Sequence, residues 1–180
     1  HSLQVQRDDS LINLPLTTQR NLELTQTLRG ETSPTLFSLL DTCESGMGSR
    51  ALKHWLLHPE RARAAAQQRL QAIGLLRERG LKDLRAVLHG ISDVERISAR
   101  LALRQSKPRE LSGLLRTLSQ AEGLRSRLLQ VLEGEGEGLL STIAAQLQPP
   151  ADVLGLLQAT LQADPAVNTR HRGESADGIE

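Results

Sequence analysis

The stretch KPRELSGLLRTL, residues 107–118, decides the fold of this chain. Pro108 suits the first turn of a helix, because the N–H groups of that turn have no partner inside the helix. Apolar residues then recur on one face and continue beyond Gly123: Leu111, Leu114, Leu115, Leu118, Leu124, Leu128 and Val131. This spacing predicts an amphipathic helix that packs along one side against its neighbours.

The composition extends that prediction to the whole chain. Hydrophobic residues make up 38% of the 180 residues, and aromatic residues only 1%. Leu and Ala together with Arg, Glu and Gln favour helix, whereas an all-β sandwich would need more Val, Thr, Tyr and Phe. We therefore expect a mainly α fold, an irregular bundle of about six or seven helices.

Start and stop signals divide the first half of the chain. Residues 11–14 and 22–24 fit short strands, which would form a small strand element near the N-terminus. Ser33–Pro34 predicts a helix start, and the break at residues 45–48 predicts its end. The next helix should end before Pro59 and carry one apolar face: Ala51, Leu52, Trp55 and Leu56.

Four further signals lie between residue 60 and the tail. A helix should run from Glu60 to Arg79, end at Gly80 and bury Ala66, Leu70, Ile73 and either Leu76 or Arg77. A short helix should follow over 81–88, and Ser92 to Glu95 reads as a capping box that starts another. The GEGEG segment at 134–138 predicts a linker, and two helical stretches should flank Pro149–Pro150.

The charge is nearly balanced overall and unevenly spread. Residues 50–127 hold 17 Lys/Arg and 7 Asp/Glu, out of 22 and 21 in the chain. Arg96, Arg100 and Arg104 repeat every four residues, and Arg109 extends this predicted basic stripe. Such a stripe can neutralise DNA phosphates, but surface arginines that pair with Glu or cover a neighbouring helix are the simpler interpretation.

No combination of residues predicts a catalytic, cofactor or metal site. His54 and His58 lie four apart, but zinc takes at least three protein ligands. The glycines at 134–138 are interrupted by Glu135 and Glu137, which would repel phosphate. The single Cys43 cannot form an internal disulfide, which favours a reducing, cytoplasmic compartment, and the sequence has no apolar run long enough to span a membrane.

Several segments, in order, resemble the MutS family of DNA mismatch-repair proteins. TTQRNLEL at 17–24, LRG at 28–30 and TLFSLLD at 35–41 are similar to the start of the family's core domain. MGSR at 47–50 with Leu52, Trp55 and Leu56 resembles the next helix, and QQRLQAI at 67–73 follows. The closest stretch is DVERISARLALR at 93–104, followed by KPREL at 107–111. Pro59–Glu60 departs from the family's pattern, as do Arg172 and Ile179 in the tail.

This resemblance implies an internal piece of a MutS-type protein, the first segment of its core or lever domain, over residues 1–163. Residues 164–180 would be a loop that leads toward the DNA clamp. The family's lever helices connect a C-terminal ATPase to that clamp, so double-stranded DNA, a second MutS subunit and a MutL-type protein are the implied partners. ATP and Mg²⁺ would bind elsewhere in the parent protein, because this chain has neither the Walker motif nor the mismatch-wedge motif.

Six residues are expected to have structural roles: Gly30, Gly48, Arg50, Trp55, Ser92 and Glu95. Trp55 in particular is expected to be a buried anchor. The competing interpretation of the whole chain is a stand-alone helical adaptor or a nonspecific nucleic-acid-binding bundle, which would complete its core from its own residues.

Overall fold

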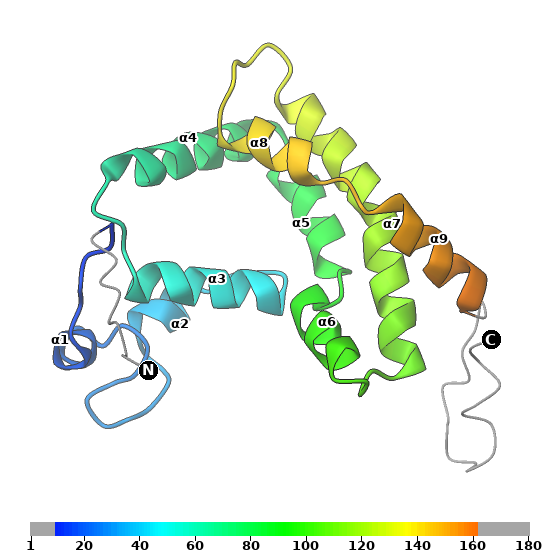
Figure 1. Ribbon diagram of the computed structural model, residues 1–180. Helices are drawn as coiled ribbons and strands as arrows, with labels where there is room; N and C mark the ends of the chain where they lie inside the picture. Colours follow the sequence, from blue (N-terminus) through cyan, green and yellow to red (C-terminus); the bar gives the residue numbers. More distant parts are fainter. Residues whose placement is uncertain (1–9, 162–180) are drawn as a thin grey trace, which may run out of the picture. The chain divides into compact units, whose positions relative to one another are not determined.

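The computed structural model describes residues 10–161 (Figure 1). The chain divides after Gln71 into two compact units, which are described separately below. The described residues form nine helices and no strand longer than an isolated bridge. The mainly α prediction is confirmed, with nine helices in these described residues in place of the expected six or seven.

The N-terminal unit contains α1 (Leu16–Asn21), α2 (Leu36–Leu40), α3 (Gly46–Leu57) and the first turns of α4 (Arg63–Arg79). Helix α2 packs on α3. The expected strand at 11–14 is reduced to one antiparallel bridge between Leu11 and Glu60. The expected strand at 22–24 is wrong, because these residues form the turn after α1, with Glu23 at a positive φ of 48°.

Helix α2 begins two residues later than Ser33–Pro34 predicted. Its N-cap is Thr35, whose side-chain oxygen accepts a hydrogen bond from the Ser38 amide at 3.1 Å. The Ser38 hydroxyl oxygen in turn accepts one from the Thr35 amide at 2.8 Å. This reciprocal pair satisfies two backbone donors at once, which fixes the start at Thr35.

The C-terminal unit is organised around one long helix, α7 (Pro108–Val131), which has 24 residues. Four shorter helices each pack on it: α5 (Leu81–His89), α6 (Val94–Ala102), α8 (Leu139–Gln146) and α9 (Ala151–Thr160). The helix start at Pro108, the linker at 134–138 and the two helices that flank Pro149–Pro150 are therefore confirmed. Figure 1 shows α7 as the central helix of this unit.

Two apolar clusters hold these helices together. One centres on Ala72, Leu84, Leu128, Val131, Leu140 and Ala144, which come from α4, α5, α7 and α8. The other centres on Ile97, Leu114 and Leu157, from α6, α7 and α9. The members that α7 contributes to the two clusters are Leu114, Leu128 and Val131, and they lie on the face of α7 that the sequence predicts.

The buried face of α4 is one position away from the expected stripe. Ala72 is 7% exposed, and Leu75 packs beside it together with Leu76, the one member of the expected stripe that joins this cluster. Leu70 and Ile73 are instead 68% and 51% exposed. The helix carries apolar residues on two faces, so periodicity alone did not distinguish the face that packs.

Helix α6 starts with a different cap from the one predicted. Asp93 is the N-cap, and its carboxylate accepts a hydrogen bond from the Arg96 amide at 3.2 Å. Ser92 instead donates its backbone N–H to the Thr117 hydroxyl of α7 at 2.8 Å. The predicted Ser92–Glu95 capping box is therefore wrong, and Ser92 connects α6 to α7.

Candidate functional site

A concave surface with several charged groups lies between α6 and α7. It is an open groove of about 890 Å³. Its walls are lined by Ser92, Asp93, Arg96, Ile97, Ala99, Arg100, Arg109, Glu110, Ser112, Gly113 and Arg116. We refer to it below as the α6/α7 groove. It lies entirely within the C-terminal unit.

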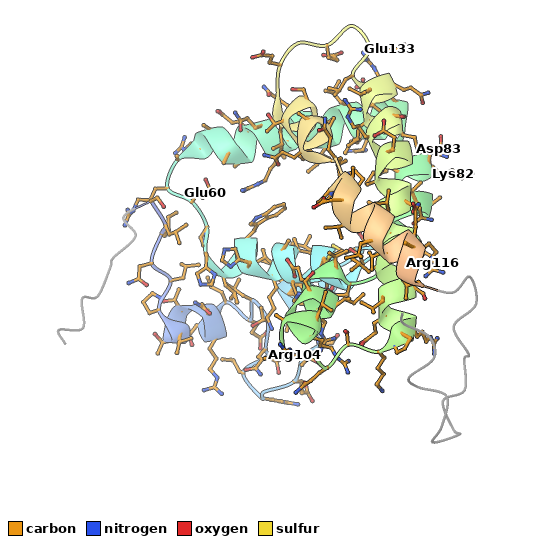
Figure 2. All side chains as sticks on the ribbon, turned by 45° about the vertical axis from the view of Figure 1, so that its right-hand side comes forward. Glu60, Lys82, Asp83, Arg104, Arg116 and Glu133 are labelled. Atoms are coloured by element: carbon orange, nitrogen blue, oxygen red, sulfur yellow. The ribbon has the colours of Figure 1, made fainter. Side chains whose placement is uncertain are left out.

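The groove brings together three of the four arginines of the predicted basic stripe. Arg96 and Arg100 come from α6, and Arg109 comes from the first turn of α7. Arg104 does not join them, because α6 ends at Ala102 and Arg104 takes a left-handed φ of 54° in the following turn. Figure 2 labels Arg104 beyond the end of α6.

Sequence reasoning missed Arg116, which lines the groove from α7 (Figure 2). It lies seven residues after Arg109, two helical turns further along the same face. Between them, Ser112 and Gly113 occupy the same face at the intermediate positions. The spacing of Arg109, Ser112, Gly113 and Arg116 was therefore the available signal, a polar stripe opposite the leucine face.

The two carboxylates in the groove are already engaged. Glu110 Oε1 pairs with Arg100 Nη1 at 2.8 Å, and Glu110 Oε2 accepts from the Lys107 amide at 2.8 Å. Asp93 caps α6 through the Arg96 amide. Within residues 10–161, no carboxylate lies within ion-pair distance of the guanidinium groups of Arg96, Arg109 or Arg116. The groove therefore carries a positive potential.

The segment just before α6 approaches α7 closely at Gly113. A Cβ atom on Gly113 would lie 2.6 Å from the Ser92 hydroxyl oxygen, closer than packed atoms allow. Together with the hydrogen bond from the Ser92 amide to the Thr117 hydroxyl, this contact fixes the distance between α7 and the start of α6. Glycine is required at position 113 because of space, since no positive φ is involved.

The histidine pair does not converge on a metal position. The His54 and His58 rings stack with centroids 4.6 Å apart. Across the part of the chain that the structure describes, no group of three or more His, Cys, Asp or Glu residues could hold a metal ion.

Trp55 is exposed, so the expectation of a buried anchor is wrong. Its side chain is 48% exposed, and the Arg69 guanidinium lies over the ring at 4.3 Å. Arg69 also pairs with Glu60 at 2.8 Å. The apolar ring is thus covered by a charged side chain, an arrangement that helical spacing does not reveal.

The other expected structural residues have mixed outcomes. Gly30 has a φ of +85°, a conformation that suits glycine. A Cβ on Gly48 would lie 3.3 Å from the Cys43 Cβ, so this glycine lets the turn before α3 pack closely. Arg50 and Glu95 are both exposed on their helices.

None of the helices within residues 10–161 is long and apolar enough to cross a membrane. The predicted loop at 164–180 lies outside the described residues.

The comparison with protein families decides the identity of the chain. A family model described as MutS domain III matches residues 17–177. The chain belongs to the MutS domain III family. This confirms the resemblance seen in the ordered segments, and identifies the chain as part of a DNA mismatch-repair protein of the MutS type.

Proposed function

We propose that this MutS domain III acts as a lever, which couples an ATPase domain of the parent protein to its DNA clamp. The observation that carries the proposal is the length of α7 and its packing against four other helices. This helix of 24 residues is about 36 Å long at 1.5 Å per residue, and four other helices pack along it.

Such an arrangement suits the transmission of a displacement. A packed helix moves as a body, because close-packed side chains shift between discrete arrangements and do not deform smoothly. The two apolar clusters pack against α7 at two separate places, one around Leu114 and the other around Leu128 and Val131. A displacement of one end of α7 would therefore displace the other end as well.

In this proposal the chain itself catalyses nothing. ATP and Mg²⁺ bind another domain, and no cofactor binds this one. Double-stranded DNA, a second MutS subunit and a MutL-type protein are partners of the parent protein, which we expect to work in the cytoplasm. A contact of the arginine stripe with DNA would be weak and independent of sequence, because phosphate contacts carry no base information.

The alternative is a stand-alone helical adaptor or a nonspecific nucleic-acid-binding bundle. Exposed apolar residues argue for the lever, because a complete module would cover them. Leu156 and Val153 of α9 are 64% and 39% exposed. Among the described residues, no large side chain is fully enclosed.

The lever can be tested by breaking α7 in its middle within a full-length MutS protein that carries this domain. Gly123 has no neighbour within 4 Å of a Cβ, so Gly123→Pro would remove a helical hydrogen bond without a side-chain collision. Gly123→Ala is the matched control, which favours the helix.

We expect Gly123→Pro to retain basal ATP hydrolysis and mismatch binding, and to lose ATP-driven release of the clamp from the mismatch. Gly123→Ala should behave as the unsubstituted protein. Circular dichroism and a thermal melt of each variant establish that the domain is folded. Normal ATP-driven release by a folded Gly123→Pro protein would refute the lever.

A further inference from the structure

A residue of another helix binds the C-terminal end of α7. Arg79 is the last residue of α4, and its Nη1 donates to the carbonyl oxygens of Val131 at 3.3 Å and Glu133 at 3.1 Å. Its Nη2 pairs with Glu135 Oε1 at 2.9 Å. Figure 2 labels Glu133 just beyond this end of α7. One guanidinium group of α4 therefore contacts three residues in and after the last turn of α7.

The last turn of a helix has carbonyl groups without partners and carries the negative end of the helix dipole. Amides of the turn that follows α7 bond the carbonyl oxygens of residues 128–130. The last turn of α7 contains no basic residue. Arg79 supplies this positive charge from 52 positions earlier in the chain, and it bonds the next carbonyl group, that of Val131.

The residue after Arg79 lies equally close to this end of α7. Gly80 is the N-cap of α5, and a Cβ atom on it would lie 2.8 Å from Val131 Cγ2, closer than packed atoms allow. The corner where α4 meets α5 is therefore in direct contact with the last residue of α7. The hydrogen bond from Arg79 and the close approach of Gly80 act at the same place.

Apolar packing between α4 and α7 does not by itself transmit a movement along the axis of α7. Ala72 of α4 packs in one cluster with Leu128 and Val131. Such packing is not directional, and packed helices can slide past one another in small shear movements. Hydrogen bonds depend on direction, and the carbonyl groups of a helix lie roughly parallel to its axis. The bond from Arg79 to the Val131 carbonyl therefore resists such sliding.

We propose that Arg79 is a positioning residue that makes α4 follow an axial displacement of α7. The bonds to the Val131 and Glu133 carbonyls provide this coupling. The partly exposed ion pair with Glu135 contributes little, because water screens it. The inference rests on the proposed lever and names the place where its displacement leaves α7. Helix α4 continues from there across Gln71 into the N-terminal unit.

The first experiment measures nucleotide coupling in a full-length MutS protein that carries this domain. The dissociation constant for a mismatched duplex is measured with and without a non-hydrolysable ATP analogue, and the ratio of the two is the coupling factor. Arg79→Gln should reduce this factor about fivefold, the lower end of typical couplings between sites. Mismatch binding without nucleotide and basal ATP hydrolysis should stay unchanged.

Two matched variants separate the contacts of Arg79. Arg77→Gln removes an exposed positive charge from the same turn of α4. Glu135→Gln removes the ion pair and leaves the bonds to the carbonyl groups in place. Both variants should keep the coupling factor of the unsubstituted protein. A loss in Glu135→Gln as large as that in Arg79→Gln would contradict the role of the carbonyl bonds.

The second experiment measures the distance between α4 and α7 directly. Spin labels fit at Gly74→Cys and Gly123→Cys, where a Cβ atom meets no other atom within 4 Å, with Cys43→Ser. In the protein with Arg79, the distribution of distances from double electron–electron resonance should not change on addition of ATP and mismatched DNA. In Arg79→Gln the same addition should shift or broaden it, because α4 no longer follows α7.

Two results would overturn the proposal. One is an unchanged coupling factor in Arg79→Gln. The other is a distance distribution in Arg79→Gln that is the same with and without ATP, which would leave Arg79 a structural role only. Either result, together with lost ATP-driven release in Gly123→Pro, removes the role of Arg79 and leaves the lever intact. Normal release by a folded Gly123→Pro protein would instead refute the lever itself.

Discussion

Each of the two units of this chain is stabilised internally by a different kind of interaction. Among the described residues of the N-terminal unit, the buried side chains are Leu24, Thr27 and Thr35, two of which are polar. The C-terminal unit instead has the two leucine-rich clusters around α7. The first unit thus depends on hydrogen bonds within turns and caps, and the second on apolar burial.

This difference determines which kind of substitution destabilises each unit most. A polar turn loses stability when one hydrogen-bonding group is removed, whereas a packed cluster loses it when volume is removed. The following predictions separate the two cases, from the largest expected effect to the smallest.

The largest effect is expected for Leu128→Ala. Leu128 is 6% exposed in the cluster that joins α4, α5, α7 and α8. Its truncation should lower the free energy of unfolding by about 2–5 kcal/mol, because a cavity remains. Chemical denaturation followed by circular dichroism measures the change. Leu129→Ala is the neighbouring control, since Leu129 is 46% exposed, and an equal loss in both variants would contradict the assigned core.

The next effect is expected in the N-terminal unit, for Thr35→Ala. Loss of the hydroxyl removes the cap on the Ser38 amide and should cost about 1–2 kcal/mol locally. Hydrogen exchange should show faster exchange of the amides in α2, with α7 unchanged. Thr32→Ala is the control, because Thr32 is engaged through its backbone carbonyl. If the amides of α2 exchange as slowly in Thr35→Ala as in the unsubstituted chain, the cap does not stabilise this unit.

A smaller effect is expected for Trp55→Ala. The ring is partly exposed under Arg69, so its removal should cost about 1 kcal/mol, well below the roughly 3–5 kcal/mol typical of a buried Trp. Arg69→Gln should change the fluorescence of this single Trp while circular dichroism stays constant. A loss above about 3 kcal/mol in Trp55→Ala would restore the buried anchor that the sequence predicts.

The smallest effect concerns pH and Asp41. A hydrogen bond from the Ser49 hydroxyl holds the pKa of Asp41 below its usual value of 3.8, against a raising effect of burial, and the Cys43 amide adds to the lowering. A carboxylate whose folded pKa is depressed stabilises the fold above its unfolded pKa, and this contribution is lost as pH falls through the folded pKa. Stability of the N-terminal unit should therefore decline slightly below about pH 4. Asp41→Asn should flatten this decline, and an unchanged acid limb would disprove the assignment.

The parts of the fold that local chemistry determines could be predicted from the sequence. Pro108, the GEGEG linker and Pro149–Pro150 define helix ends through backbone geometry alone, and the leucine spacing of α7 identifies its packed face. The start of α2 and the cap of α6 were misassigned by one or two residues. In both places neighbouring polar residues offer alternative N-caps, and the fold decides between them.

The failures that matter for the site depend on tertiary contacts. Trp55 has helical spacing with leucines, yet a residue 14 positions away, Arg69, covers its ring. The predicted arginine stripe assumed that α6 continues to Arg104, whereas the helix ends at Ala102. Arg116 joins the groove only because α7 packs against α6, a pairing that no spacing within one helix reveals.

The central claim is that α7 moves as a rigid rod in the parent protein, and a distance measurement tests it most directly. Spin labels at Lys107→Cys and Gln130→Cys, with Cys43→Ser, would be about 35 Å apart along the helix. Double electron–electron resonance on the full-length protein should give one narrow distribution of distances between the two labels. This distribution should be the same before and after addition of ATP and mismatched DNA. A distance that shortens or broadens with nucleotide would show that α7 bends, and would contradict its role as a lever.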